Sequence, residues 1–190
     1  MKRLLALGVL GLTAYAVSHA AAAASTGSHV TAAQSGYVNP LAGQQWTDAR
    51  TDQGVDYQPV APEPVRAIGD GTVVFSSTAT GWPGGGFISY KLKSGRAAGH
   101  VVYVAEHLSG LAPAGSTVRA GETIATAWPG YPWTDWGWAT CSGDLPAVQY
   151  NGAPDGTPMA GGLAFARFMR NLGAGSAQDP GPGPDVMKGC

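Results

Sequence analysis

Between Val60 and Ala127 the chain consists of short runs of β-branched, aromatic and other apolar residues, separated by glycine, proline and aspartate. Runs of this length and composition favour strands, and the residues between them favour tight turns. The runs are Pro64–Ile68, Thr72–Phe75, Phe87–Leu92, Val101–Val104, Thr117–Val118 and Thr123–Ala125. The sequence therefore predicts a mainly β fold built from strands and hairpins.

One of the turns is Gly69-Asp70-Gly71, which lies between the first two of these runs. Glycine reaches positive φ at no steric cost, and aspartate tolerates it better than most residues. We interpret this tripeptide as the turn of a hairpin.

A helical pattern follows the strand region. Large apolar residues recur at helical spacing between Gly162 and Gly173, namely Leu163, Phe165, Phe168, Met169 and Leu172. This spacing predicts one C-terminal amphipathic helix that packs against the sheet.

The ends of the chain differ from this central part. Lys2 and Arg3, the apolar run Leu4–Val17 and the small residues Ala20–Ala24 form the pattern of a signal peptide. A membrane anchor is the alternative, but the run is shorter than the roughly 20 apolar residues that cross a bilayer. We expect a signal peptide at 1–24, a flexible leader at 25–36, one folded domain at 37–173 and a disordered tail at 174–190, in a product that is secreted or associated with the cell wall.

Charge and cysteine content narrow the function. The net charge is −1, and the basic residues are scattered, which argues against nucleic acid and against a membrane surface as a partner after cleavage. The sequence contains two cysteines, Cys141 and Cys190, which an oxidising compartment would allow to pair. A free thiol at Cys190 is the alternative, and we expect a monomer.

Five segments share their order and spacing with a known architecture. They are Thr51–Tyr57 (TDQGVDY), Pro64–Ala67 (PVRA), Gly69–Val73 (GDGTV), Ala105–Ser109 (AEHLS) and Gly115–Ala125 (GSTVRAGETIA). Together they resemble the lysostaphin-type zinc peptidases of bacterial cell walls. The resemblance covers roughly residues 50 to 140. It implies a small antiparallel β-sandwich or barrel-like sheet, the duplicated hybrid motif, with a groove across one face.

The resemblance also implies a metal site, whose positions are largely substituted here. The family holds zinc with a histidine, an aspartate four residues later and a second histidine downstream, and the ion activates a water. Asp52 occupies the first histidine position, Asp56 keeps the aspartate, and His107 matches a catalytic histidine after one inserted residue. The chain has no histidine after His107, and the segment that should carry one offers only Asp135.

A site built on Asp52 and Asp56 without imidazole would be harder and more anionic than a zinc site, which favours Ca²⁺ or Mn²⁺ over zinc. We therefore expect no bound cofactor, with a divalent metal, zinc or calcium, as the alternative. A purely structural role is also open for the two aspartates, as turn caps or as partners of Arg50 or Arg66.

Aromatic residues gather just beyond the strand region. Tyr131, Trp133, Trp136 and Trp138 lie close together among proline and glycine, in what we interpret as a loop. Flat rings of this kind stack on sugars or clasp peptides, so we expect these four to include substrate-binding residues. We expect Trp136 and Trp138 to point to opposite faces, with one of them inside.

Two functions follow. The first is a secreted, peptidase-like domain that binds peptidoglycan or a wall-associated partner and has lost zinc-dependent catalysis. The alternative is an active, metal-dependent peptidoglycan endopeptidase, in which Asp135 or Glu106 joins Asp52 and Asp56 as a ligand and His107 is the base.

Overall fold

The computed structural model describes residues 36–187, which form ten strands and one helix within that range. The strands are β1 (Trp46–Thr51), β2 (Val55–Pro59), β3 (Glu63–Arg66), β4 (Gly71–Ser77), β5 (Phe87–Leu92), β6 (Val101–Ala105), β7 (Leu108–Ser109), β8 (Thr117–Val118), β9 (Thr123–Ala127) and β10 (Thr134–Ala139), and the helix is α1 (Ala160–Asn171). The predicted mainly β class with one C-terminal helix is confirmed.

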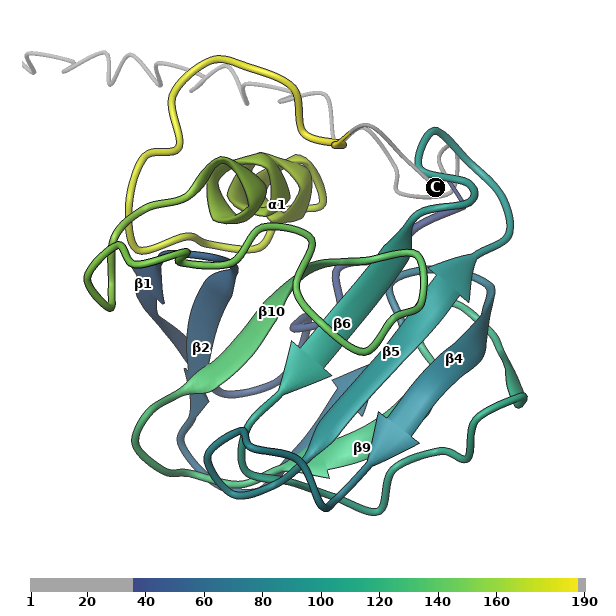
Figure 1. Cartoon of the computed structure of the whole chain (residues 1–190). Helices are drawn as coiled ribbons and strands as arrows, with labels where there is room; N and C mark the ends of the chain where they lie inside the picture. The colour runs from purple at the N-terminus through teal and green to yellow at the C-terminus, as the bar shows by residue number, and fades with distance from the viewer. Residues whose placement is uncertain (1–35, 188–190) are drawn as a thin grey trace, which may run out of the picture.

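The strands form two antiparallel sheets (Figure 1). The larger sheet has seven strands in the order β1-β2-β10-β6-β5-β4-β8, and the smaller one has three in the order β3-β9-β7. Among the described residues neither sheet closes into a barrel, so the arrangement is that of a β-sandwich. The main hydrophobic core contains residues of both sheets and of the helix.

The turn Gly69–Gly71 does not make a hairpin. β3, which precedes it, pairs with β9, whereas β4, which follows it, pairs with β5 and β8 in the other sheet. Gly69 instead forms an isolated bridge with Tyr37, whose ring leaves no room for a side chain at this position. A turn sequence specifies a sharp reversal, but the choice of partner strand depends on contacts distant in the sequence.

Part of the aromatic segment is a strand, because Trp136 and Trp138 belong to β10, whereas Tyr131 and Trp133 lie in the loop between β9 and β10. β10 lies between β2 and β6 in the middle of the larger sheet, and all six of its residues are buried. Trp136 and Trp138 both belong to the main core, so the expectation that they point to opposite faces is wrong. Residues two apart in a strand share a face, and this face of β10 is turned towards α1.

The helix α1 packs across β1, β2 and β10, as Figure 1 shows. Phe165 and Phe168 are buried, and their rings make edge contacts with Trp138 at centroid distances of 5.1 and 4.9 Å. Burying aromatic side chains in this way is a major source of stability for a small domain. The predicted packing of the helix on the sheet is confirmed.

The described part of the tail, residues 174–187, lies against α1, and the predicted disorder of residues 174–190 stays a prediction. This described part has no helix or strand, yet Arg167 Nε donates to the carbonyl of Pro184 at 2.7 Å, and Arg170 pairs with Asp179 at 2.6 Å. His100 Nε2 also lies 2.6 Å from the carbonyl of Met187. These side chains stabilise an irregular segment that composition alone marks as unstructured.

Several predictions fall on residues that the structure does not describe. The signal peptide at 1–24, nearly all of the leader at 25–36, and Cys190 lie outside the described residues, so these predictions and the pairing of Cys190 with Cys141 stay predictions. In the described part, no helix combines the length and apolarity that a membrane span requires.

Candidate functional site

The register of four neighbouring strands places charged residues in one row. Arg50 on β1 lies opposite Asp56 on β2, Asp56 lies opposite Asp135 on β10, and Asp135 lies opposite Ala105 on β6. Directly opposed residues in antiparallel strands share a face and bring their Cβ atoms to about 5 Å. Two carboxylates therefore meet side by side in the centre of the sheet, where like charges repel unless a cation compensates them.

Arg50 supplies compensation on one side of this row. Its Nε lies 2.5 Å from Asp56 and 2.9 Å from Asp52, which follows directly after β1. Its two terminal nitrogens each donate to the exposed carboxylate of Asp155 at 3.1 Å. Tyr150 adds a hydroxyl donor to Asp52 at 2.5 Å. Asp52 and Asp56 are each only 2% exposed, so one guanidinium and one hydroxyl hold two buried carboxylates.

Asp135 lies on the other side and is less well satisfied. Its Oδ2 accepts a hydrogen bond from Tyr103 at 2.7 Å, but its Oδ1 is buried and has no hydrogen-bond partner. This oxygen lies against Gly54, where an added Cβ would approach it to 2.1 Å. Gly54 therefore leaves room for the carboxylate because it has no side chain.

The turn after β6 decides which side chain faces the site. Glu106 and His107 both have positive φ, 75° and 49°, a conformation that costs non-glycine residues about 1–2 kcal/mol each. Glu106 lines the pocket next to Asp135, and its Oε2 is buried without a partner. The ring of His107 packs against Gly84 and Gly130 and is not among the residues that line the pocket. The predicted catalytic role of His107 stays a prediction, and the structure places Glu106 in the pocket instead.

Burial and mutual repulsion raise the pKa of several of these acids. Burial, and then the charge of Asp52, raise the pKa of Asp56 to about 7, although Arg50 partly offsets both. Burial and the charge of Asp56 raise the pKa of Glu106 to about 8. The pKa of Asp135 lies well above its usual value for the same two reasons. These acids therefore tend to hold a proton near neutral pH, because one guanidinium cannot compensate all of the carboxylates if every one of them is ionised.

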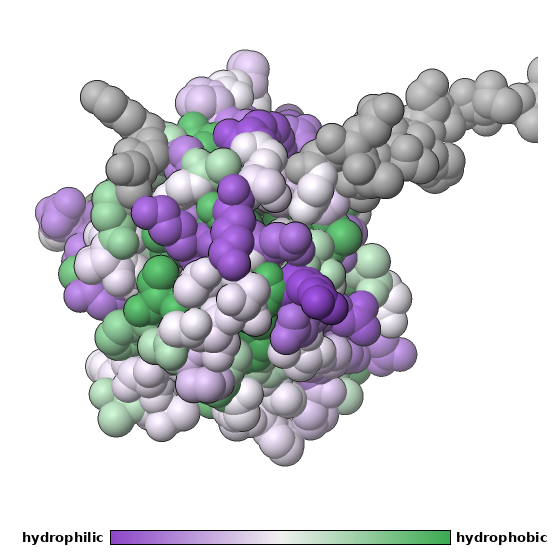
Figure 2. Space-filling view, turned by 90° about the vertical axis from the view of Figure 1, so that its right-hand side faces the viewer, coloured by the Kyte–Doolittle hydropathy of each residue, from purple (hydrophilic) through white to green (hydrophobic). Residues whose placement is uncertain are grey.

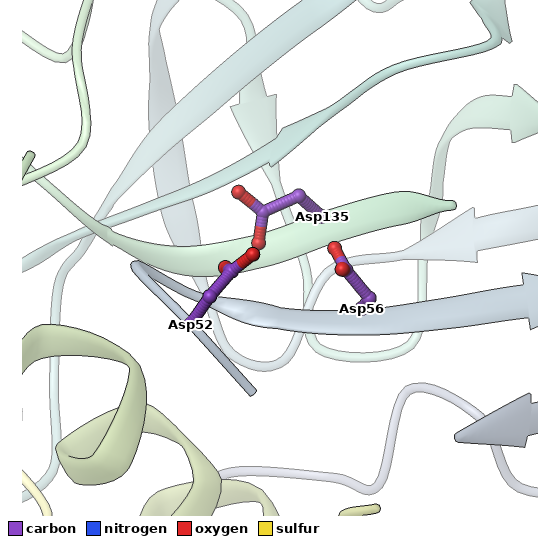
Figure 3. A group of neighbouring side chains, drawn as sticks. All are labelled: Asp52, Asp56 and Asp135. Carbon is purple, nitrogen blue, oxygen red and sulfur yellow. The ribbon is translucent and has the colours of Figure 1, made fainter. Parts of the chain in front are cut away.

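These acids form the floor of a pocket with a volume of about 530 Å³. Loops form its rim, with Trp82 from the β4–β5 loop, Tyr131 from the β9–β10 loop, and Leu145 and Tyr150 from the segment between β10 and α1. Figure 3 shows the carboxylates of Asp52, Asp56 and Asp135 converging from their separate positions. Figure 2 shows one face of the molecule, on which hydrophilic residues form a central band and hydrophobic residues form only separate patches.

The four predicted aromatic residues divide between core and rim. Trp136 and Trp138 are 0% and 2% exposed, so their rings offer no surface to a ligand, and this corrects their expected role. Tyr131 is 74% exposed and lines the pocket. Trp133 is half-buried, donates to Gln58 at 2.9 Å and stacks on the guanidinium of Arg50 at 5.6 Å. Tyr131 is thus the predicted residue that lies where a ligand can reach it.

The donor set does not fit zinc. Oxygen atoms of the three aspartates lie within 4.8 Å of one another, but no imidazole joins them among the described residues. Zinc sites in proteins rely on imidazole or thiolate ligands, whereas an all-carboxylate set suits a hard cation such as Ca²⁺. In addition, two of the three carboxylates are already paired with Arg50. The predicted preference for a hard cation over zinc stays a prediction.

Sequence reasoning did not assign several residues of the site. Tyr103, Tyr150 and Asp155 each bond a carboxylate or the guanidinium from segments 32 to 105 residues away in the sequence. No local pattern identifies them. Arg50 could be predicted from the sequence, because a basic residue two positions before Asp52 can form an ion pair with it. The structure contains this ion pair.

Comparison with known proteins assigns no family. No family model matches the chain, and no curated protein matches it. Among solved structures the chain is similar to the NMR solution structure of lysostaphin, with 18% sequence identity and a TM-score of 0.48. The similarity covers 80% of this chain and 59% of that chain, so the chain spans less than two thirds of the lysostaphin length. A similarity this distant carries no argument about function.

Proposed function

We propose that the chain is a secreted, peptidase-like domain that binds bacterial peptidoglycan, or a wall-associated partner, as a monomer and without zinc-dependent catalysis. The observation that carries this proposal is the pairing of Arg50 with both Asp52 and Asp56. A guanidinium in this position supplies the positive charge that a metal ion would supply. Arginine is always charged and offers no open coordination position for a reacting water, so the site can hold a ligand but cannot activate water as a metal does.

Two features support a wall ligand. The order of the segments from Thr51–Tyr57 to Gly115–Ala125 resembles that of the lysostaphin-type wall peptidases. The pocket volume of about 530 Å³ falls in the range of small-molecule and peptide-group sites, and the exposed ring of Tyr131 at its mouth suits a peptide or sugar.

The test uses the chain without residues 1–24 and purified peptidoglycan sacculi. We expect the protein to sediment with the sacculi, to release no soluble fragments and to contain less than stoichiometric zinc. Tyr131→Ala should reduce sedimentation, whereas Val60→Ala, which truncates another exposed apolar side chain that lies outside the pocket, should not. Stoichiometric zinc together with fragment release would overturn the proposal.

A second candidate is a metal-dependent peptidoglycan endopeptidase with substituted ligands. One observation favours it, the convergence of carboxylate oxygens of Asp52, Asp56 and Asp135 within 4.8 Å. In this case Asp56→Ala abolishes uptake of Ca²⁺ or Mn²⁺, a chelator stops fragment release, and Asp179→Ala on the exposed tail changes neither. Protein that takes up no metal and acts unchanged in the chelator would remove this candidate.

A further inference from the structure

Two carboxylates in the pocket lack part of their hydrogen bonding. Asp135 is 2% exposed and Glu106 is 6% exposed, and each has one buried oxygen without a partner. Both residues line the same pocket. A buried polar atom without a partner costs about 1–3 kcal/mol, and a charged one costs more. Such atoms in a native fold therefore need an explanation.

Among the described residues that line the pocket, Arg50 is the one cation, and its guanidinium is already engaged. All three nitrogens of the Arg50 guanidinium already bond carboxylates, with Nε on Asp56 and both terminal nitrogens on Asp155. Five carboxylates and this single guanidinium are the charged groups that line the pocket. A positively charged hydrogen-bond donor from outside the chain would supply both the missing hydrogen bonds and a compensating charge.

We propose that this pocket recognises a primary ammonium group on a peptide, with the unpartnered oxygens of Asp135 and Glu106 accepting two of its three hydrogen bonds. The proposal rests on the proposed function and deepens it, because it makes the ligand an amine-bearing peptide of the wall polymer.

An ammonium group fits the pocket better than a bare metal ion. Ca²⁺ takes six to eight oxygen ligands at 2.3–2.6 Å, but Asp52 and Asp56 would have to leave Arg50 before they could coordinate it. An ammonium needs only three acceptors and leaves Arg50 in place. The pocket is also far larger than an ion requires, and the rings of Tyr131 and Trp82 at its rim can flank an alkyl stem or a cation.

Calorimetric titration with Nα-acetyl-lysine amide tests the proposal, with the Nζ-acetylated compound as the neutral control. We expect the neutral compound to bind at least ten times more weakly. Glu106→Gln should lower affinity for the amine about tenfold and leave affinity for the neutral compound unchanged. Glu63→Gln, on β3 and outside the pocket, should change neither. Equal binding of the two compounds, or stoichiometric Ca²⁺ binding with no amine binding, would overturn the proposal.

Tyr131→Ala provides a second variant, at a position where the side chain is 74% exposed and contributes little to the core. We expect it to weaken amine binding several-fold, and unchanged binding would count against the proposal.

Sacculi with chemically acetylated amines separate this inference from the proposed function. Equal sedimentation on native and acetylated sacculi contradicts amine recognition but retains wall binding. Amine binding without sedimentation on either contradicts wall binding but retains the amine site.

Discussion

The buried carboxylates on the two sides of the acidic pocket differ in how their charge is compensated. On one side Asp52 and Asp56 are compensated by Arg50, which is itself held by Asp155. On the other side Asp135 has only the hydroxyl of Tyr103, and Glu106 has a buried oxygen with no partner. On the first side a guanidinium of the protein itself compensates the carboxylates, whereas on the second side part of their hydrogen bonding has no partner. This difference supports the proposal that the first side is structural and that the second binds a ligand.

Removal of Arg50 should have the largest effect on stability. Arg50→Met keeps the aliphatic length but leaves two buried carboxylates without a cation, and breaking a buried pair costs about 3–5 kcal/mol. Chemical denaturation at pH 7.5 measures the change in the free energy of unfolding. Arg170→Met is the matched control, because its pair with Asp179 is exposed and contributes little. Equal losses in the two variants would mean that the Arg50 cluster is not a structural centre.

Tyr103→Phe tests the other side. At nearly constant volume, the variant removes the one hydrogen bond that the carboxylate of Asp135 accepts among the described residues, so the unfolding free energy should fall by about 1–3 kcal/mol. Tyr131→Phe, at an exposed position, should change it by less than about 0.5 kcal/mol. A Tyr103→Phe variant as stable as the parent would show that Asp135 is satisfied by another group.

Glu106→Gln should alter how stability depends on pH. The pKa of Glu106 is about 8 in the folded protein, above the ordinary value of 4.5, so the folded state binds the proton more tightly than the unfolded state. The stabilisation that this proton binding provides is therefore fully present below about pH 4.5 and is lost as the pH rises through about 8. Glutamine removes this titration, so the variant should gain about 1 kcal/mol or more over the parent at pH 8.5 and little at pH 5. Chemical denaturation at both pH values measures this difference, with Glu63→Gln as control. If the unfolding free energies of the variant and the parent change with pH in the same way, the raised pKa of Glu106 is contradicted.

Asp155→Asn should have the smallest effect. Asp155 is 71% exposed, so its pair with Arg50 is screened by solvent, and the loss should be below about 1 kcal/mol. The same denaturation experiment compares it with Asp179→Asn, the exposed partner of Arg170. A loss as large as that of Arg50→Met would mean that Asp155 and not the buried aspartates sets the position of the guanidinium.

Much of the fold was predictable from local pattern. The runs that became β3 to β6, β8 and β9 are rich in β-branched or aromatic residues, and α1 follows the spacing of Phe165 and Phe168. The prediction failed at β10, because a strand buried on both faces lacks polar alternation and this one carries a glycine between two tryptophans. It failed again at Gly69–Gly71, because turn residues do not specify which strand pairs with which.

The candidate site was predictable only in part. Asp52, Asp56 and Asp135 stand out in the sequence against a family pattern, and the structure brings these three together. The places of Glu106 and His107 were not predictable, because two positive φ angles in the turn after β6 decide which of them faces the pocket. The hydroxyls of Tyr103 and Tyr150 come from distant segments and leave no local pattern.

The sequence by itself determined the class of the fold and the acidic and imidazole-poor donor set, because each depends on residue type and short-range spacing. The tertiary structure decided which carboxylates have a partner. Strand register places Arg50, Asp56 and Asp135 in one row, and the turn after β6 adds Glu106 at its end. Charge compensation depends on distances of a few ångströms between residues far apart in the chain, and only the folded backbone sets those distances.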